Sequence, residues 1–239
     1  MSKVLSDCIK VNSIVKPADM EYYINFDNPK EKKKFIDRCE RVIRSSLEYK
    51  DYIKFLKENC DMTQCAFFNH INSKEMKRVK IEIHHEPFTL YDYVTVVVDR
   101  MINEGEKLND LLVADEVMAL HYENMVGLIP LTKTIHQIIH SKESNKLLIP
   151  INLCYGNYMA FLQKYEGKCS DEVIDALYDK LEEKIAYTKE LTKESFDAIM
   201  KEFTYLDIQG QEEIEKIPID YNEDEERLQQ VMQSYMVAS

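Results

Sequence analysis

Apolar residues recur three or four positions apart along most of this chain, the spacing of an α-helix that buries one face. Asp27, Asn28 and Pro29 form a helix start, because a capping side chain precedes a proline that suits the first turn. The spacing predicts helices that begin at Pro29 and that cover about 47–59, 91–103, 113–124, 158–164, 171–191, 195–203 and 225–235. The chain is therefore expected to be predominantly helical.

A second pattern, with a period of two, is confined to short segments. Between 79 and 84, Ile81 and Ile83 alternate with Glu82 and His84, as in a half-buried strand. Segments 65–71 and 147–153 are also predicted as strands, and 127–131 as a short extended piece. The β-branched run 94–98 fits either a helix or a strand. These strands make the predicted fold class α+β.

The charge of the chain is acidic but uneven. The formal net charge is −12, yet residues 1–80 carry 17 lysines and arginines against 12 acidic residues. A phosphate-facing surface is therefore expected in this N-terminal third. The acidic C-terminal third has two interpretations, a solvated face or a tail that limits unspecific binding. No apolar run approaches a membrane span and the start lacks a signal-peptide core, which predicts a cytoplasmic protein without membrane partners (in the host cytoplasm if phage-encoded).

The number and positions of the glycines and cysteines argue against several classes of protein. Only five glycines occur and none forms a phosphate-cradling loop, so a Rossmann or P-loop fold is not expected. The six cysteines are scattered without a CxxC pair, which predicts reduced thiols, most of them buried. The alternative is a structural zinc ion at Cys60 and Cys65, the one close pair.

Four of the six histidines lie in two pieces, 80–87 and 127–140. His136 and His140 are four apart on a predicted helix, so both can reach one metal ion from the same face. Ile135, Ile138 and Ile139 form the neighbouring stripe and are expected to anchor this helix to the core. The alternative is an ordinary pair of surface or core histidines.

His84 and His85 are adjacent at the end of a predicted strand. Neighbours on a strand point to opposite faces, so one imidazole can bind a metal ion while the other serves as a base. Imidazole titrates near pH 6.5 and can take a proton from water at physiological pH. The alternative is two half-exposed histidines at a strand end.

Taken together, the His-His strand, the Leu-Ile-Pro-Leu segment and the HxxxH helix resemble the HNH (ββα-metal) nuclease superfamily. The four histidines are similar to those of its histidine-rich branch, the colicin-type DNases, and to HNH-like proteins of phages. The resemblance covers about residues 65–150 and implies a ββα-metal core. It departs from the family at Gly127, which stands where the motif has Asn. Two predicted helices also lie between the pieces, and the bracing cysteine pairs are missing.

The resemblance also implies a role for each histidine. His85 matches the general base, His84 and His136 match the core metal ligands, and His140 matches the additional ligand of the histidine-rich branch. One divalent ion is implied, with magnesium, zinc, nickel and manganese all open. The implied partner is nucleic acid, with DNA expected first.

Four further residues are candidates for supporting contacts. Glu82 shares a strand face with His84 and is expected to orient it, or else to pair with Lys80. His121 could contact phosphate or be a structural helix residue, and Asn124 could substitute for the motif Asn. Lys133 could meet phosphate at the start of the histidine helix or be a solvated lysine. His70 is assigned no role.

The expected organisation is a helical, basic-faced region at 1–64, an HNH-like core with a two-helix insertion at 65–153, and an acidic helical region at 154–239. The first hypothesis for function is metal-dependent hydrolysis of phosphodiester bonds, with His85 as base. The alternative is an inactive HNH-like fold that serves as a nucleic-acid-binding or structural phage module. A third hypothesis is a helical protein whose histidines are incidental.

Overall fold

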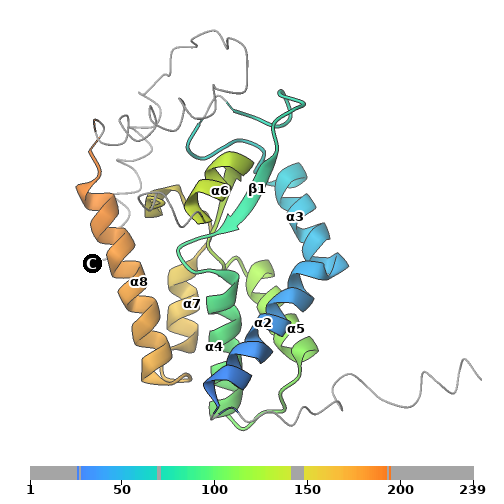
Figure 1. Ribbon diagram of the computed structural model, residues 1–239, viewed down its shortest axis with the longest axis vertical. Helices are drawn as coiled ribbons and strands as arrows, with labels where there is room; N and C mark the ends of the chain where they lie inside the picture. The colour runs from blue at the N-terminus through green and yellow to red at the C-terminus, as the bar shows by residue number, and fades with distance from the viewer. Residues whose placement is uncertain (1–25, 27, 69–70, 141–147, 193, 195–239) are drawn as a thin grey trace, which may run out of the picture. The chain divides into compact units, whose positions relative to one another are not determined.

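The computed structural model describes residues 26, 28–68, 71–140, 148–192 and 194 (Figure 1). Helices dominate, and two strands form a single small sheet within this part of the chain, which confirms a mostly helical α+β fold. The elements in chain order are α2 (Pro29–Ser45), α3 (Leu47–Asn59), β1 (Ile81–His85), α4 (Leu90–Asn103), α5 (Asp110–Tyr122), β2 (Leu128–Thr132), α6 (Lys133–His140), the 3-10 helix η2 (Ile151–Leu153), α7 (Tyr158–Tyr165) and α8 (Asp171–Glu190).

The chain divides into two compact units, each built from separated segments. We call the first the helical unit; it comprises Met1–Lys54, Phe88–Val126 and Gly156–Asp179. We call the second the sheet unit; it comprises Phe55–Pro87, Gly127–Tyr155 and Lys180–Ser239. This division is interleaved along the chain, whereas the sequence suggested three consecutive regions, 1–64, 65–153 and 154–239. The two predicted insertion helices, α4 and α5, belong to the helical unit.

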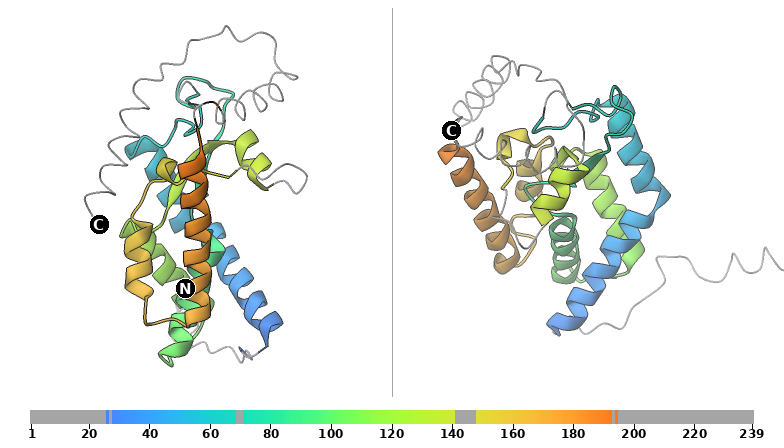
Figure 2. Two further views of the ribbon diagram at one scale, coloured as in Figure 1. Left: turned by 90° about the vertical axis from the view of Figure 1, so that its left-hand side faces the viewer. Right: turned by 45° about the horizontal axis from the view of Figure 1, so that its top comes forward.

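Helix α4 forms the centre of the helical unit, in contact with α2 and α5 (Figures 1 and 2). Its β-branched run, 94–98, is helical rather than extended. A capping box at Thr89 favours the helix over a strand. The Thr89 hydroxyl accepts a hydrogen bond from the amide of Asp92, and the Asp92 carboxylate accepts one from the amide of Thr89. This capping box begins a helix just before the run. The start predicted at Asn28 is confirmed, because its side chain accepts a hydrogen bond from the amide of Lys30.

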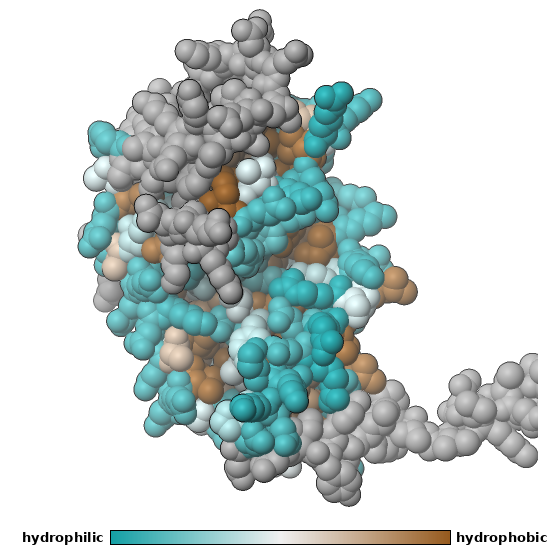
Figure 3. Space-filling model, viewed as in Figure 1, coloured by the Kyte–Doolittle hydropathy of each residue, from teal (hydrophilic) through white to brown (hydrophobic). Residues whose placement is uncertain are grey.

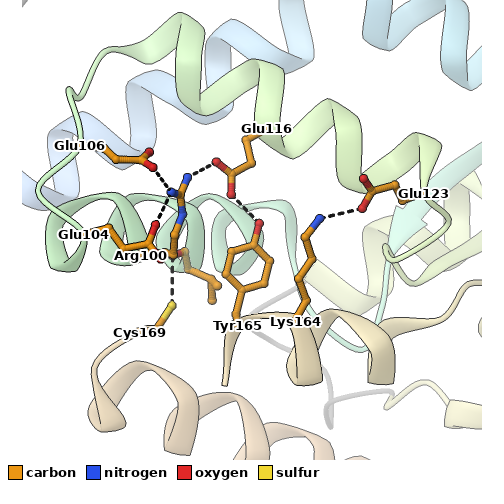
Figure 4. A network of polar contacts seen from close by, with 9 residues as sticks. Arg100, Glu104, Glu106, Glu116, Glu123, Lys164, Tyr165 and Cys169 are labelled. Carbon is orange, nitrogen blue, oxygen red and sulfur yellow. Dashed lines mark hydrogen bonds and ion pairs between the residues drawn. The ribbon is translucent and has the colours of Figure 1, made fainter. Parts of the chain in front are cut away.

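A buried arginine organises the polar contacts of the helical unit (Figure 4). Arg100 pairs through Nη1 with Glu104 and Glu106, at 2.7 Å each, and through Nη2 with Glu116. Tyr165 donates its hydroxyl to the other oxygen of Glu116, at 2.6 Å. Burial opposes the charge on Arg100, but the carboxylates outweigh it and hold the pKa of the guanidinium above its ordinary value. The network links α4, α5 and α7.

The sheet unit is built on β1 and β2, which pair antiparallel with Ile81 opposite Thr132 and His85 opposite Leu128. Helix α6 follows β2 directly and contacts both strands, and Figure 1 shows it beside β1. Ile135 is buried, and Ile138 and Ile139 pack against the same core, as the apolar stripe of this helix predicted. The core cluster also contains Cys65, Phe67, Ile81, Ile129, Leu131 and Ile149.

Two predicted strands are wrong. Segment 65–71 has no strand among its described residues, although Gln64 and Asn72 form an isolated bridge and Ala66 donates its amide to Pro130 O at 2.8 Å. Cys65 and Phe67 are buried although they lie in a loop, so their burial does not require an extended backbone. The described part of 147–153 ends in the turn η2, where Pro150 lacks the amide hydrogen that a ladder needs. The helices predicted at 195–203 and 225–235 lie outside the described residues.

Several basic residues of α2 are paired with acidic residues. On α2, Arg38 pairs with Asp110 at 3.2 Å, and Lys32 with Asp99 at 3.0 Å. Lys33 and Arg44 pair with acidic residues four positions away on the same helix. Apolar residues appear as separate brown areas among hydrophilic ones in Figure 3. Within the described chain, none of the helices combines the length and the apolar character needed to cross a membrane.

Candidate metal centre

The three predicted ligands lie together in the sheet unit. His84 comes from β1, and His136 and His140 come from the apolar-anchored helix α6. One ring nitrogen from each of the three lies within 4.8 Å of the others, and the Nε2 atoms of His136 and His140 are 3.2 Å apart. His84 is buried, His136 is partly exposed and His140 is exposed, so one side of this histidine group faces solvent. We call these three residues the histidine cluster.

A carboxylate fixes one ring of the histidine cluster. Glu82 Oε2 accepts a hydrogen bond from His136 Nδ1 at 2.7 Å, which leaves Nε2 of His136 as the nitrogen that faces His140. The other oxygen of Glu82 pairs with Lys80 at 3.1 Å. Partial burial works against the charge, but His136 and Lys80 lower the pKa of Glu82. Glu82 therefore orients His136 of α6, and it also forms the pair with Lys80 that was the alternative expectation.

A second carboxylate, which the sequence reasoning did not select, lies next to His84. Glu86 is 4% exposed, and its Oε2 is 3.5 Å from His84 Nε2. Its Oε1 forms an ion pair with Lys184 of α8. The signal in the sequence was the acidic residue two positions after His84, in His84-His85-Glu86. Lys184 gave no local signal because it is distant in the chain.

The end of β1 is held against Gly127 by the main chain. The amide of Glu86 donates to Gly127 O at 3.0 Å. A Cβ atom on Gly127 would lie 2.0 Å from Glu86 O and 2.8 Å from Pro87 Cδ. A side chain at this position would collide with the backbone of Glu86, which explains the glycine. A backbone hydrogen bond links the two chain segments at this point.

His85 does not join the histidine cluster. It lies opposite Leu128 in the sheet and is 3% exposed. Its neighbour His84 belongs to the cluster. This difference agrees with the alternation of a strand, in which adjacent side chains point to opposite faces. The proposed base is therefore outside the histidine cluster and shielded from solvent.

The comparison with known families concerns most of the chain. Residues 7–214 match the family described as bacteriophage G278-like virion protein. The chain belongs to this family. The match agrees with the expectation of a phage protein, and the family description names a particle protein without an activity. No curated protein and no solved structure matches the chain.

In this member of the virion protein family, His121 is part of the helical core. It is 2% exposed, and its ring packs edge-on against Tyr49 and Tyr52. Nδ1 donates to Val117 O at 2.7 Å. Burial lowers the pKa of His121 to about 4, although this hydrogen bond works in the opposite direction. Burial and these ring contacts favour the interpretation of His121 as a structural helix residue.

The low pKa of His121 predicts acid sensitivity of the helical unit. Between pH 6.5 and about 4 the unfolded chain binds a proton that the native ring refuses, so stability falls as the pH is lowered through this window. This group alone should remove about 3 kcal/mol of unfolding free energy by pH 4. We expect His121→Gln to flatten that part of the profile, measured by urea unfolding from pH 7 to 4. An unchanged slope would contradict the assignment.

Asn124 and Lys133 lie at the ends of helices. Asn124 follows α5 with a positive φ of 56°, a conformation that Asn tolerates at helix ends, and its carbonyl accepts a hydrogen bond from the amide of Asn157 at 2.7 Å. It therefore ends a helix in the helical unit. Lys133 begins α6 with an exposed side chain, while its amide donates to Lys80 O at 3.1 Å. That amide extends the ladder between the strands.

The cysteines do not form a metal site in the described part of the chain. Cys39, Cys60, Cys65, Cys154 and Cys169 are free thiols, three of them buried. Cys60 is exposed while Cys65 lies in the sheet-unit core, where burial raises its pKa. A thiol kept protonated by burial is a poor zinc ligand. Reduced thiols are confirmed for these five, and His70 and Cys8 lie outside the described residues.

Proposed function

We propose that this phage protein is a metal-dependent nuclease whose divalent ion is held by His84, His136 and His140. The convergence of these three nitrogens carries the proposal. An antiparallel strand pair followed by a helix that contacts both strands is the arrangement that a ββα-metal core requires. The HNH resemblance of the sequence and this geometry point to the same site.

One pair of the histidine cluster has the spacing of ligands on a tetrahedral ion, and the nitrogen of His84 lies within 4.8 Å of both. Two nitrogens bound at about 2.05 Å to a tetrahedral ion are about 3.3 Å apart, close to the 3.2 Å between His136 and His140. The Glu82 carboxylate on His136 is the partner that metal-bound imidazoles usually have. Three protein ligands leave a fourth position for water or phosphate, which is the pattern of a catalytic site. An all-imidazole set favours zinc or nickel, with manganese and magnesium as further candidates.

The chemistry proposed is hydrolysis of a phosphodiester bond. A bound divalent ion would supply positive charge to the phosphate and to the leaving oxygen. His85 would take the proton of the attacking water at its ring nitrogen. Because His85 is 3% exposed in the free protein, this role requires the ring to reach its water in the substrate complex.

A structural metal site is the second candidate function. Two observations favour it: the family is one of virion proteins, and His85 is shielded from solvent. In this case the ion would hold β1 and α6 together in a particle protein without cleaving nucleic acid. Both candidates share the histidine cluster and differ in the role of His85.

Two alanine variants separate the candidates. Metal affinity is measured by calorimetry with Zn²⁺, Ni²⁺ and Mn²⁺, and nicking is measured on supercoiled plasmid with each of these ions and Mg²⁺. A nuclease requires that His85→Ala keeps the metal affinity and loses nicking by about 100-fold or more, and that His136→Ala loses both. His121→Gln, a histidine variant in the other unit, should behave as wild type.

Each negative result has a distinct meaning. Wild-type protein that binds metal and leaves single- and double-stranded DNA and RNA intact would support the structural site and refute the nuclease. Wild-type protein that binds none of the ions would refute both candidates.

A further inference from the structure

Glu86 is an acidic side chain enclosed between a histidine of the cluster and a lysine from another element. It is 4% exposed, with one oxygen 3.5 Å from His84 Nε2 and the other paired with Lys184. The lysine side chain is itself only 17% exposed. All three residues belong to the sheet unit, and Lys184 enters it from the C-terminal part of α8.

The charges explain why the lysine is needed. An ionised carboxylate without a counter-charge is costly inside a protein. Lys184 supplies the counter-charge on the side of Glu86 that faces away from His84. The pair with Lys184 thereby fixes the position of the Glu86 carboxylate next to His84.

We propose that Lys184 is a positioning residue of the metal centre, which holds the Glu86 carboxylate against His84 and so orients this imidazole for metal binding. This inference rests on the proposed metal site. It gives His84 the carboxylate support that Glu82 provides to His136 at 2.7 Å. Through Lys184, α8 would also contribute to the metal centre, although none of the three proposed ligands lies on this helix.

The test uses Co²⁺, whose visible absorption reports the ligand set. We expect Lys184→Met to weaken Co²⁺ binding by about 10- to 100-fold, the usual cost of losing such a supporting group. Glu86→Gln should weaken it by a similar factor. The double variant should bind no more weakly than Glu86→Gln alone, because Lys184 acts through Glu86. Lys189→Met, an exposed lysine of the same helix, is the matched control and should bind as wild type.

The outcomes separate a positioning role from a structural one. If Lys184 were merely structural, Lys184→Met would lower the melting temperature of the metal-free protein and leave the Co²⁺ affinity of the folded protein unchanged. Losses that multiply in the double variant would also overturn the proposal, as would a shift of the Co²⁺ bands in Lys184→Met, which would show Glu86 binding the ion. The double variant carries no buried charge at this pair, so it remains measurable if Lys184→Met does not fold.

The metal site itself has a separate check. Wild-type protein should show Co²⁺ bands that His136→Ala abolishes. If wild type shows none, the proposed metal site fails and the role of Lys184 fails with it. If wild type binds Co²⁺ and Lys184→Met matches Lys189→Met, only the role of Lys184 is refuted.

Discussion

Replacing Gly127 with alanine should destabilise the sheet unit by about 3 kcal/mol or more. The added Cβ would lie 2.0 Å from Glu86 O and 2.9 Å from Glu86 C, and both are backbone atoms that cannot rotate away. Relief requires β1 and β2 to separate where the amide of Glu86 donates to Gly127 O. The strand end that carries His84 moves with them, so Co²⁺ affinity should fall as well. Urea unfolding and Co²⁺ titration measure the two effects.

Gly105→Ala is the control for this substitution. Gly105 has a positive φ of 68° and no atom within 4 Å of an added Cβ, so alanine there brings backbone strain without a clash. It should cost about 1 kcal/mol and leave Co²⁺ binding unchanged. If Gly127→Ala were no more costly than Gly105→Ala, the steric explanation for glycine at the motif position would be wrong.

Replacing Arg100 with methionine should destabilise the helical unit by about 3 kcal/mol. The methionine fills a similar volume but leaves Glu116 partly buried without its cation, and Tyr165 then becomes its remaining partner in this network. Glu104 and Glu106 are more exposed and can regain water, which keeps the cost at the lower end for a broken buried pair. The melting temperature should fall by about 6 to 12 °C for a chain of this size.

Arg44→Met is the matched control, since it makes the same substitution at an exposed pair. Arg44 bonds Glu40 at 2.8 Å, four residues apart on α2, and its side chain is 49% exposed. Solvent screens such a pair, so its loss should cost less than about 1 kcal/mol. Equal losses in the two variants would mean that the Arg100 network contributes no more than a surface pair.

Local sequence was sufficient for most helices. The start of α2 at Pro29 and that of α4 after Thr89 follow from capping side chains that lie within one turn of the helix they begin. The spacing of Ile135, Ile138 and Ile139 likewise predicted which face of α6 is packed. Where only apolar content was available, as at 65–71, the prediction of a strand was wrong, because a buried loop has the same composition.

Local sequence predicts one part of the candidate site, and tertiary structure decides the other. The HxxxH spacing on α6 places His136 and His140 together, since four residues make about one helical turn. The placement of His84 beside them depends on the pairing of β1 with β2, which are separated in the sequence by α4 and α5. The family resemblance suggested this pairing, whereas the local sequence pattern could not predict it.

Contacts through space account for what the sequence did not reveal. Glycine at 127 reflects the position of the Glu86 carbonyl, and the enclosed Glu86 depends on Lys184 from α8. His121 was a candidate phosphate contact until the rings of Tyr49 and Tyr52 placed it in a core. Spacing along the chain predicts which residues share a helix face or strand. It does not predict which distant backbone or side chain occupies the space beside them, because that depends on how the elements pack.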